Sequence, residues 1–273
     1  MGLLNQNNII TLFSDKPGPK VCIIGGVHGN ERCGYEAIKE ITSKNLINLI
    51  KGELTFIIAN QKAIDQNVRF IDENLNRCFK KDKPASNSYE DNLAKEIMPI
   101  LEQCDISLDL HAASSESTRK FIICEENAYT HIKTIPIKTV CSGFDSLNGG
   151  GTDSFMNSIG KVGICVECGY LADASSTNIA IETVYSFLSR LGMVDYHMEE
   201  SEKEYLNIDY LYKCKSNFSL AKQFENFEDV KKGDLIGIDG KTKVIAEKDG
   251  FILFATNRNK SDPIKESFIL GII

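Results

Sequence analysis

The sequence of 273 residues lacks any apolar stretch long enough to span a bilayer. Its first twenty residues also lack the basic segment followed by an apolar segment that marks a secretory leader. We therefore expect a cytoplasmic protein. The formal net charge of -7 at pH 7 disfavours general affinity for nucleic acid or for an anionic membrane, so we expect neither as a partner.

Glycine/serine-rich or proline-rich linkers, internal repeats and low-complexity segments are also lacking. The composition, with 42% hydrophobic and 25% charged residues, is ordinary for a folded globular protein. The length exceeds that of a usual single domain. We expect a large catalytic domain over residues 1–194 and a small β-rich domain over residues 195–273, packed directly against the first because no flexible linker separates them.

A disulfide framework is not expected. The nine cysteines are odd in number and scattered, and Cys165 and Cys168 form a CxxC with no second CxxC to complete a zinc site. These two cysteines lie in an apolar run, where strand alternation would turn them to opposite faces. We interpret all nine as reduced thiols and this pair as core residues.

Apolar runs alternate with helical patterns along the first two thirds of the chain. Strands are predicted near 20–26, 54–59, 105–111, 121–124 and 162–168, and helices near 38–52, 88–104 and 177–191. Such alternation is typical of an α/β fold with a mixed, largely parallel sheet flanked by helices. After about residue 195 the pattern changes to short strand-like runs between turns, which indicates the small β-rich domain.

Two of the four histidines follow predicted strands. His28 and Glu31 lie three residues apart in a glycine-flanked loop, and His111 ends another strand. A zinc hydrolase keeps about three protein ligands of these types and one open position, and ligands of open α/β sheets bind beyond the strand ends. The three residues are therefore candidate zinc ligands. The alternative is a loop histidine beside a helix-starting glutamate, with His111 as a hydrogen-bonded core residue.

Further polar residues fall near the same strand ends. Glu167 ends an apolar strand, where burial would raise its pKa toward the range of a general base, unless it is a paired structural acid. Arg69, Asn76 and Arg77 share the loop 60–79. Arginine suits a carboxylate or a developing oxyanion. The alternative is solvated arginines that neutralise the neighbouring acids.

Four short motifs, HGNE, NLNR, DLH and VECG, together resemble the succinylglutamate desuccinylase and aspartoacylase family, which is related to the zinc carboxypeptidases. The resemblance spans most of the chain and implies a zinc carboxypeptidase-like fold with a small C-terminal domain. It implies one Zn2+ per chain and a set of roles: zinc ligands His28, Glu31 and His111, general base Glu167, carbonyl-polarising Arg69, and carboxylate-binding Asn76 and Arg77.

Two positions depart from the family pattern. Asn74 replaces the aspartate of the family's DLNR, which removes a charge that could orient Arg77 or set substrate preference. Some members also use a tyrosine from the small domain, whereas no tyrosine follows Tyr212 here and Tyr170 is a weak stand-in. Both departures affect the expected substrate more than the expected class of reaction.

The expected function is that of a zinc-dependent amide hydrolase that removes an acyl group from a small, carboxylate-bearing N-acyl amino acid. A homo-oligomer is compatible with the sequence. The nearest alternative is a zinc carboxypeptidase acting on a peptide or cell-wall fragment, which the motifs do not separate from a deacylase. A non-catalytic zinc-binding protein is the third interpretation. Glu167 and Arg69 argue against it, because holding a metal requires neither.

Overall fold

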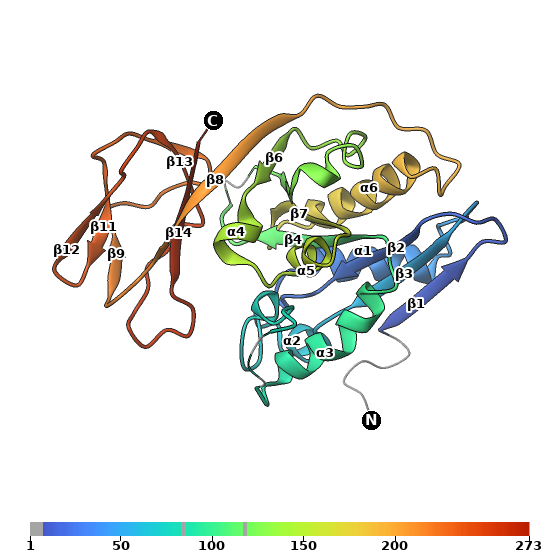
Figure 1. Ribbon diagram of the computed structural model, residues 1–273, viewed down its shortest axis with the longest axis horizontal. Coiled ribbons are helices and arrows are strands. Elements are labelled where there is room, and N and C mark those ends of the chain that lie inside the picture. Colours follow the sequence, from blue (N-terminus) through green and yellow to red (C-terminus); the bar gives the residue numbers. More distant parts are fainter. Residues whose placement is uncertain (1–7, 83, 85, 117–118, 273) are drawn as a thin grey trace.

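Figure 1 shows the computed structural model, which describes residues 8–272 apart from 83, 85, 117 and 118. The strands of its large sheet are β1 (Ile9–Phe13), β2 (Lys20–Gly25), β3 (Glu53–Ile58), β4 (Ile106–Ala113), β5 (Phe121–Cys124), β6 (Thr139–Ser142), β7 (Val162–Tyr170), β8 (Glu204–Lys213), β10 (Glu228–Val230), β13 (Gly250–Leu253) and β14 (Glu266–Ile272). A smaller sheet contains β9 (Phe218–Leu220), β11 (Leu235–Asp239) and β12 (Thr242–Ile245). The helices are α1 (Arg32–Ser43), α2 (Gln61–Gln66), α3 (Tyr89–Leu101), α4 (Phe144–Asn148), α5 (Thr152–Ser158) and α6 (Ser175–Arg190), with 3-10 turns η1 (Leu75–Arg77) and η2 (Glu126–Ala128).

The large sheet has the order β1-β3-β2-β4-β7-β5-β6-β8-β14-β13-β10. Its centre is parallel, because β3, β2, β4 and β7 run in one direction, and its two ends are antiparallel. None of the helices in the described part of the chain is long and apolar enough to cross a membrane. The expected α/β class, with a mixed and largely parallel sheet flanked by helices, is confirmed.

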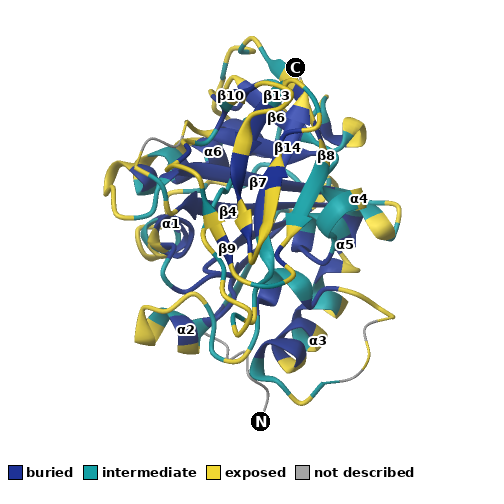
Figure 2. Ribbon diagram, turned by 90° about the vertical axis from the view of Figure 1, so that its left-hand side faces the viewer, coloured by how far each residue is buried: buried dark blue, intermediate teal, exposed yellow. Residues whose placement is uncertain are grey.

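The central strands are apolar because both faces of the sheet are covered. In β2, Val21 and Ile23 pack with α1 and α6 on one face, whereas Cys22 and Ile24 pack with α3 and α5 on the other. Figure 2 shows the buried residues gathered in these strands and the exposed residues on the outer turns of the helices and in loops. Parallel sheets typically have both faces covered by helices in this way.

Two glycines bring α1 close to the strand ends. A Cβ atom at Gly25 would lie 2.4 Å from the backbone carbon of Gly34, and one at Gly34 would lie 2.6 Å from the carbonyl oxygen of Leu110. Both distances are too short for a real side chain, so the helix backbone packs directly on β2 and β4. This contact fixes the position of the loop that joins β2 to α1.

The helix predicted to run to Gly52 ends earlier, at Ser43. The N–H of Leu46 donates to the carbonyl of Ile41 and the N–H of Asn45 donates to that of Thr42, the pair of bonds that defines a Schellman end. Asn45 has a φ of 49° and therefore takes the left-handed position that glycine usually fills. Gly52 instead lies in the turn before β3.

The C-terminal part is rich in β-structure, as expected. Strands β8, β14, β13 and β10 extend the large sheet beyond β6, and β12, β11 and β9 form the smaller antiparallel sheet at the end of the molecule away from α1 and α6 (Figure 1). The division into domains at residues 1–194 and 195–273 stays a prediction, since the large sheet continues past that point.

All nine cysteines are free and buried, so the absence of disulfides is confirmed. Cys168 packs in the core beside α1 and α6, whereas Cys165 packs on the other face of β7. The two residues of the CxxC therefore face opposite sides, as strand alternation predicts.

Candidate metal centre and active site

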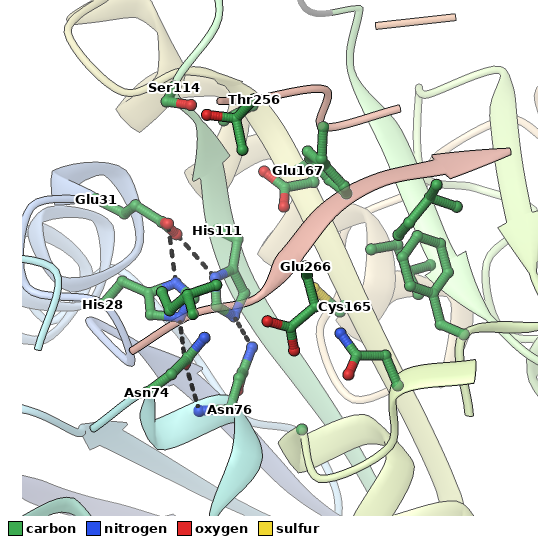
Figure 3. Close-up of a pocket in the computed structure, with 18 of the residues that line it drawn as sticks. His28, Glu31, Asn74, Asn76, His111, Ser114, Cys165, Glu167, Thr256 and Glu266 are labelled. Atoms are coloured by element: carbon green, nitrogen blue, oxygen red, sulfur yellow. Dashed lines mark hydrogen bonds and ion pairs between the residues drawn. The ribbon is translucent and has the colours of Figure 1, made fainter. Parts of the chain in front are cut away.

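His28, Glu31 and His111 meet at one point, with their ligand atoms within 4.8 Å of one another. His28 and Glu31 lie in the loop between β2 and α1, and His111 lies in β4. The Nδ1 atoms of His28 and His111 each lie 2.8 Å from a different carboxylate oxygen of Glu31 (Figure 3). All three side chains are buried. Glu31 precedes the first turn of α1 without capping it, because its carboxylate faces the histidines.

The outer nitrogens of both histidines have other partners. The Nε2 atom of His28 lies 2.9 Å from Oδ1 of Asn74, and that of His111 lies 3.1 Å from Oδ2 of Asp109. The backbone N–H of Asn76 also donates to Oδ1 of Asn74, which identifies that oxygen as an acceptor. His28 therefore donates from Nε2, and its Nδ1 lone pair points toward Glu31. Metal-binding histidines characteristically have their second nitrogen held in this way.

The donor set fits a divalent metal such as zinc. Burial, followed by the charge of Arg69, lowers the pKa of His28 to about 4, so this ring is neutral at pH 7. Its Nδ1 lone pair and a Glu31 oxygen then face each other at 2.8 Å, an arrangement that favours a cation between them. Burial alone would lower the pKa of His111, but Asp109 and Glu31 raise it. Two imidazoles and one carboxylate are a ligand set used by catalytic zinc sites.

Glu167 stands beside this cluster on β7, paired in register with His111 on β4. Its side chain points into the pocket (Figure 3) and is 8% exposed, and its Oε2 atom has no hydrogen-bond partner in the described part of the chain. Burial, followed by the charge of Glu31, raises its pKa to about 7. A buried carboxyl group without a partner destabilises the folded protein. Its presence therefore indicates that it interacts with a ligand.

The three predicted residues of loop 60–79 also reach the site. Nη1 of Arg69 donates to Oε1 of Glu31 at 2.7 Å. Nδ2 of Asn76 lies 3.4 Å from Nε2 of His111, and Oδ1 of Asn76 is a shielded atom without a partner in the described residues. Arg77 donates from Nη1 to the carbonyl of Asn76. The interpretation of these arginines as purely solvated is wrong for Arg69, whose partner is a buried carboxylate.

One pocket of about 450 Å³ collects all of the predicted site residues, which are His28, Glu31, Arg69, Asn76, Arg77, His111 and Glu167. Tyr170 and Tyr212 do not line it. The roles assigned to the seven residues stay predictions, whereas their convergence is a property of the fold.

Other lining residues carry no sequence motif that would have marked them. Glu266 and Arg258 come from the C-terminal β-region. Asp153 lies in the first turn of α5, two residues after the run of Gly149, Gly150 and Gly151. This run of glycines before β7 was the available signal, because such runs accompany close backbone approach to a ligand.

Comparisons with known proteins agree with this geometry. The family model for the succinylglutamate desuccinylase/aspartoacylase catalytic domain matches residues 17–190. A probable aspartoacylase of Nostoc sp. is 28% identical over 168 residues, which is 56% of this chain and 56% of that relative. A succinylglutamate desuccinylase of Pseudoalteromonas atlantica is 27% identical over 294 aligned positions, covering 94% of this chain and 82% of the relative.

Among solved structures, succinylglutamate desuccinylase from Vibrio cholerae has the same fold, with a TM-score of 0.81 at 19% identity, covering 98% of this chain and 86% of that chain. The segment matched by the family model exceeds half of the chain and contains all seven predicted site residues. The chain therefore belongs to the succinylglutamate desuccinylase/aspartoacylase family.

Proposed function

We propose that this protein is a zinc-dependent hydrolase that removes the acyl group from an N-acyl amino acid. The observation that carries the proposal is the partnerless, buried carboxyl group of Glu167 beside the cluster of His28, Glu31 and His111. Relatives in the family bear the names aspartoacylase and succinylglutamate desuccinylase, and both names denote the cleavage of an acyl group from an amino acid.

His28, Glu31 and His111 would hold one zinc ion per chain. Zinc bound there would polarise the amide carbonyl and make a bound water acidic enough to give a nucleophile near neutral pH. Asn74 and Asp109 keep the two histidine rings oriented through their outer nitrogens.

Glu167 acts as the general base. Its free oxygen takes a proton from the attacking water, and the same carboxyl group returns that proton to the nitrogen of the leaving amino acid as the amide C–N bond breaks. The raised pKa supports both steps, because a group that titrates near pH 7 exchanges protons readily in either direction.

The remaining residues orient the substrate. Arg69 uses one N–H on Glu31, and the other donors of its guanidinium are available to the carbonyl oxygen as negative charge grows on it. Asn76 and Arg77 hold the α-carboxylate of the amino acid through charge-assisted hydrogen bonds. A carboxylate bound there lies beside the cluster, since Asn76 contacts His111.

The size and the walls of the pocket favour small acyl amino acids over peptides. Its volume of about 450 Å³ lies at the small end of ligand sites, and Thr256, Arg258 and Glu266 from the C-terminal region form one of its walls. A carboxypeptidase needs a cleft that is open toward the preceding residues of its peptide.

Metal analysis combined with an assay of amine release tests the proposal. We expect about one zinc per purified chain, and release of free amino acid from members of a panel of N-acetyl and N-succinyl amino acids. A chelator should abolish this activity and zinc should restore it. Cleavage of C-terminal residues from dipeptides alone would identify a carboxypeptidase. Zinc-loaded protein that cleaves nothing in either panel would identify a non-catalytic metal-binding protein.

A further inference from the structure

Two carboxylates line the pocket without a role in the steps above. Asp153 comes from the first turn of α5 and Asp145 from α4. The other acids among the described lining residues have partners or a catalytic role, since Glu31 contacts both histidines, Glu266 binds Arg77, and Glu167 serves as the base.

Asp153 lies next to the residue that orients the substrate carboxylate. A Cβ atom placed on Gly151 would lie 2.5 Å from Oδ1 of Asp153 and 3.8 Å from Cγ of Asn76. Both groups therefore lie beside Gly151 in the same pocket. An amino acid held by Asn76 and Arg77 would have its side chain near Asp153.

Asp153, Asp145 and Asn76 bring hydrogen-bond acceptors to this part of the pocket, and the backbone N–H of Ser154 donates to Asp153. No lysine or arginine of the described residues forms an ion pair with Asp153 or Asp145, and the amide of Asn157 is the side-chain donor to Asp145. Oδ1 of Asn76 is shielded from water and has no donor within the described chain. A ligand that brings N–H donors would satisfy these acceptors together.

The acids in this corner repel one another, so the carboxyl group of Asp153 is charged only in part near pH 7. Burial, followed by the charge of Asp145, raises the pKa of Asp153 to about 7, and Asp109 on β4 adds to the effect. Arg77 does not neutralise them, because its Nε binds Glu266 and its Nη1 binds the carbonyl of Asn76. A second carboxylate entering this space would be repelled, whereas an ammonium group would be attracted.

We propose that Asp153, assisted by Asp145, forms the subsite for the side chain of the amino acid and selects N-acyl amino acids whose side chain carries an amine. This inference rests on the proposed deacylase function and narrows its substrate class. The α-carboxylate still binds Asn76 and Arg77, so the substrate bears one carboxylate and one ammonium group instead of two carboxylates.

The test compares three side chains of similar length on zinc-loaded protein. The probes are Nα-acetylornithine, Nα-acetylnorleucine and Nα-acetylglutamate, which present an ammonium, a methyl group and a carboxylate. We expect kcat/KM to fall in that order, with at least about tenfold between the first two, the discrimination that a charge-assisted hydrogen bond gives. The D153N variant should bring the ratio of kcat/KM for the ornithine derivative to kcat/KM for the norleucine derivative toward one.

Two further variants fix the interpretation. D145N, which changes the assisting acid, should narrow the same ratio less. D229N, which changes an exposed acid on β10, should leave it unchanged. If the D153N protein has lost zinc or its helical circular-dichroism signal, the result for D145N alone decides whether these acids select an amine-bearing side chain. Equal or better cleavage of the glutamate derivative by the wild type overturns the inference and leaves the deacylase function standing. If the protein cleaves none of the three probes and nothing in the wider acyl panel, both the subsite and the deacylase function are excluded.

Discussion

Glu266 accepts a hydrogen bond from Nε of Arg77 at 3.1 Å, although the two residues lie 189 positions apart in the sequence. Glu266 begins β14 and Arg77 ends η1, so the last strand of the chain reaches the arginine proposed to bind the substrate carboxylate. Asn74 does not take this role, because its side chain contacts His28 and the backbone of Asn76. The charge missing at residue 74 is thus not what orients Arg77 in this protein.

Substitution of Glu266 by alanine should raise KM for carboxylate-bearing substrates. A partly exposed ion pair contributes about 1 kcal/mol, which corresponds to roughly fivefold in KM. The turnover number should change little, because the contact of Arg77 with the carboxylate exists in the ground state and the transition state alike. Steady-state kinetics would check this. E266Q should recover part of the loss, and E102Q at the exposed Lys81 pair is the control. A fall in kcat with constant KM would contradict the role.

Asn74 should set the zinc affinity through His28. Replacing it by leucine removes the acceptor for Nε2 of His28, and a loss on the order of 10- to 100-fold in affinity is expected for such a partner. N74D should bind zinc more tightly than the wild type, since a carboxylate makes the ring a better ligand. Competition with a fluorescent chelator measures both. N92D, at an exposed position of α3, serves as the control. Unaltered affinity in N74L would show that this contact is dispensable.

Glu167 should be required for turnover and not for metal binding. E167Q keeps the shape of the side chain and removes the proton acceptor, so we expect zinc content to remain at the wild-type level while kcat falls on the order of 10²- to 10⁴-fold. Elemental analysis and the amine-release assay give the two quantities. E126Q, in the short turn η2, is the matched control. An E167Q protein with normal turnover would exclude Glu167 as the base.

Asp239 should make the C-terminal β-region sensitive to acid. Its carboxylate accepts from the backbone N–H groups of Lys215 and Ser216 and from the hydroxyl of Tyr212. Burial would raise its pKa, but these hydrogen bonds hold it below the ordinary value. Between the folded and the unfolded pKa the unfolded state binds more protons.

The stabilisation from Asp239 is therefore complete above the unfolded pKa of about 3.9 and disappears as the pH falls through the lower, folded pKa. Urea unfolding at a series of pH values should show a steeper loss of stability below pH 4 for the wild type than for D239N. D15N, in an exposed loop, should behave as the wild type does. Parallel curves for wild type and D239N would refute the assignment.

The convergence of His28, Glu31, His111 and Glu167 could be predicted because it follows from strand direction. β2, β4 and β7 are parallel neighbours, so residues at their carboxyl ends meet, and His111 and Glu167 are directly paired. Histidines are rare in this chain, which made their placement informative. The apolar runs of the sequence predicted these strands, and so they identified the polar residues at the strand ends.

The missed residues depend on pairings between distant segments. Glu266 and Arg258 reach the pocket because β14 pairs with β8, which pairs with β6. No short motif encodes that order. The early end of α1 escaped for another reason: Asn45 occupies a left-handed position at modest cost, so the apolar spacing that continues to residue 50 did not reveal the break.

The direct contact of Gly25 with Gly34 limits which positions of this protein can be varied by design. A side chain at either position would push α1 away from β2 and β4 and so displace Glu31 from His28 and His111. Libraries should therefore hold both glycines constant. The segment around Asp153 lies on another wall of the pocket, so variation there can alter the proposed substrate subsite without touching His28, Glu31 or His111.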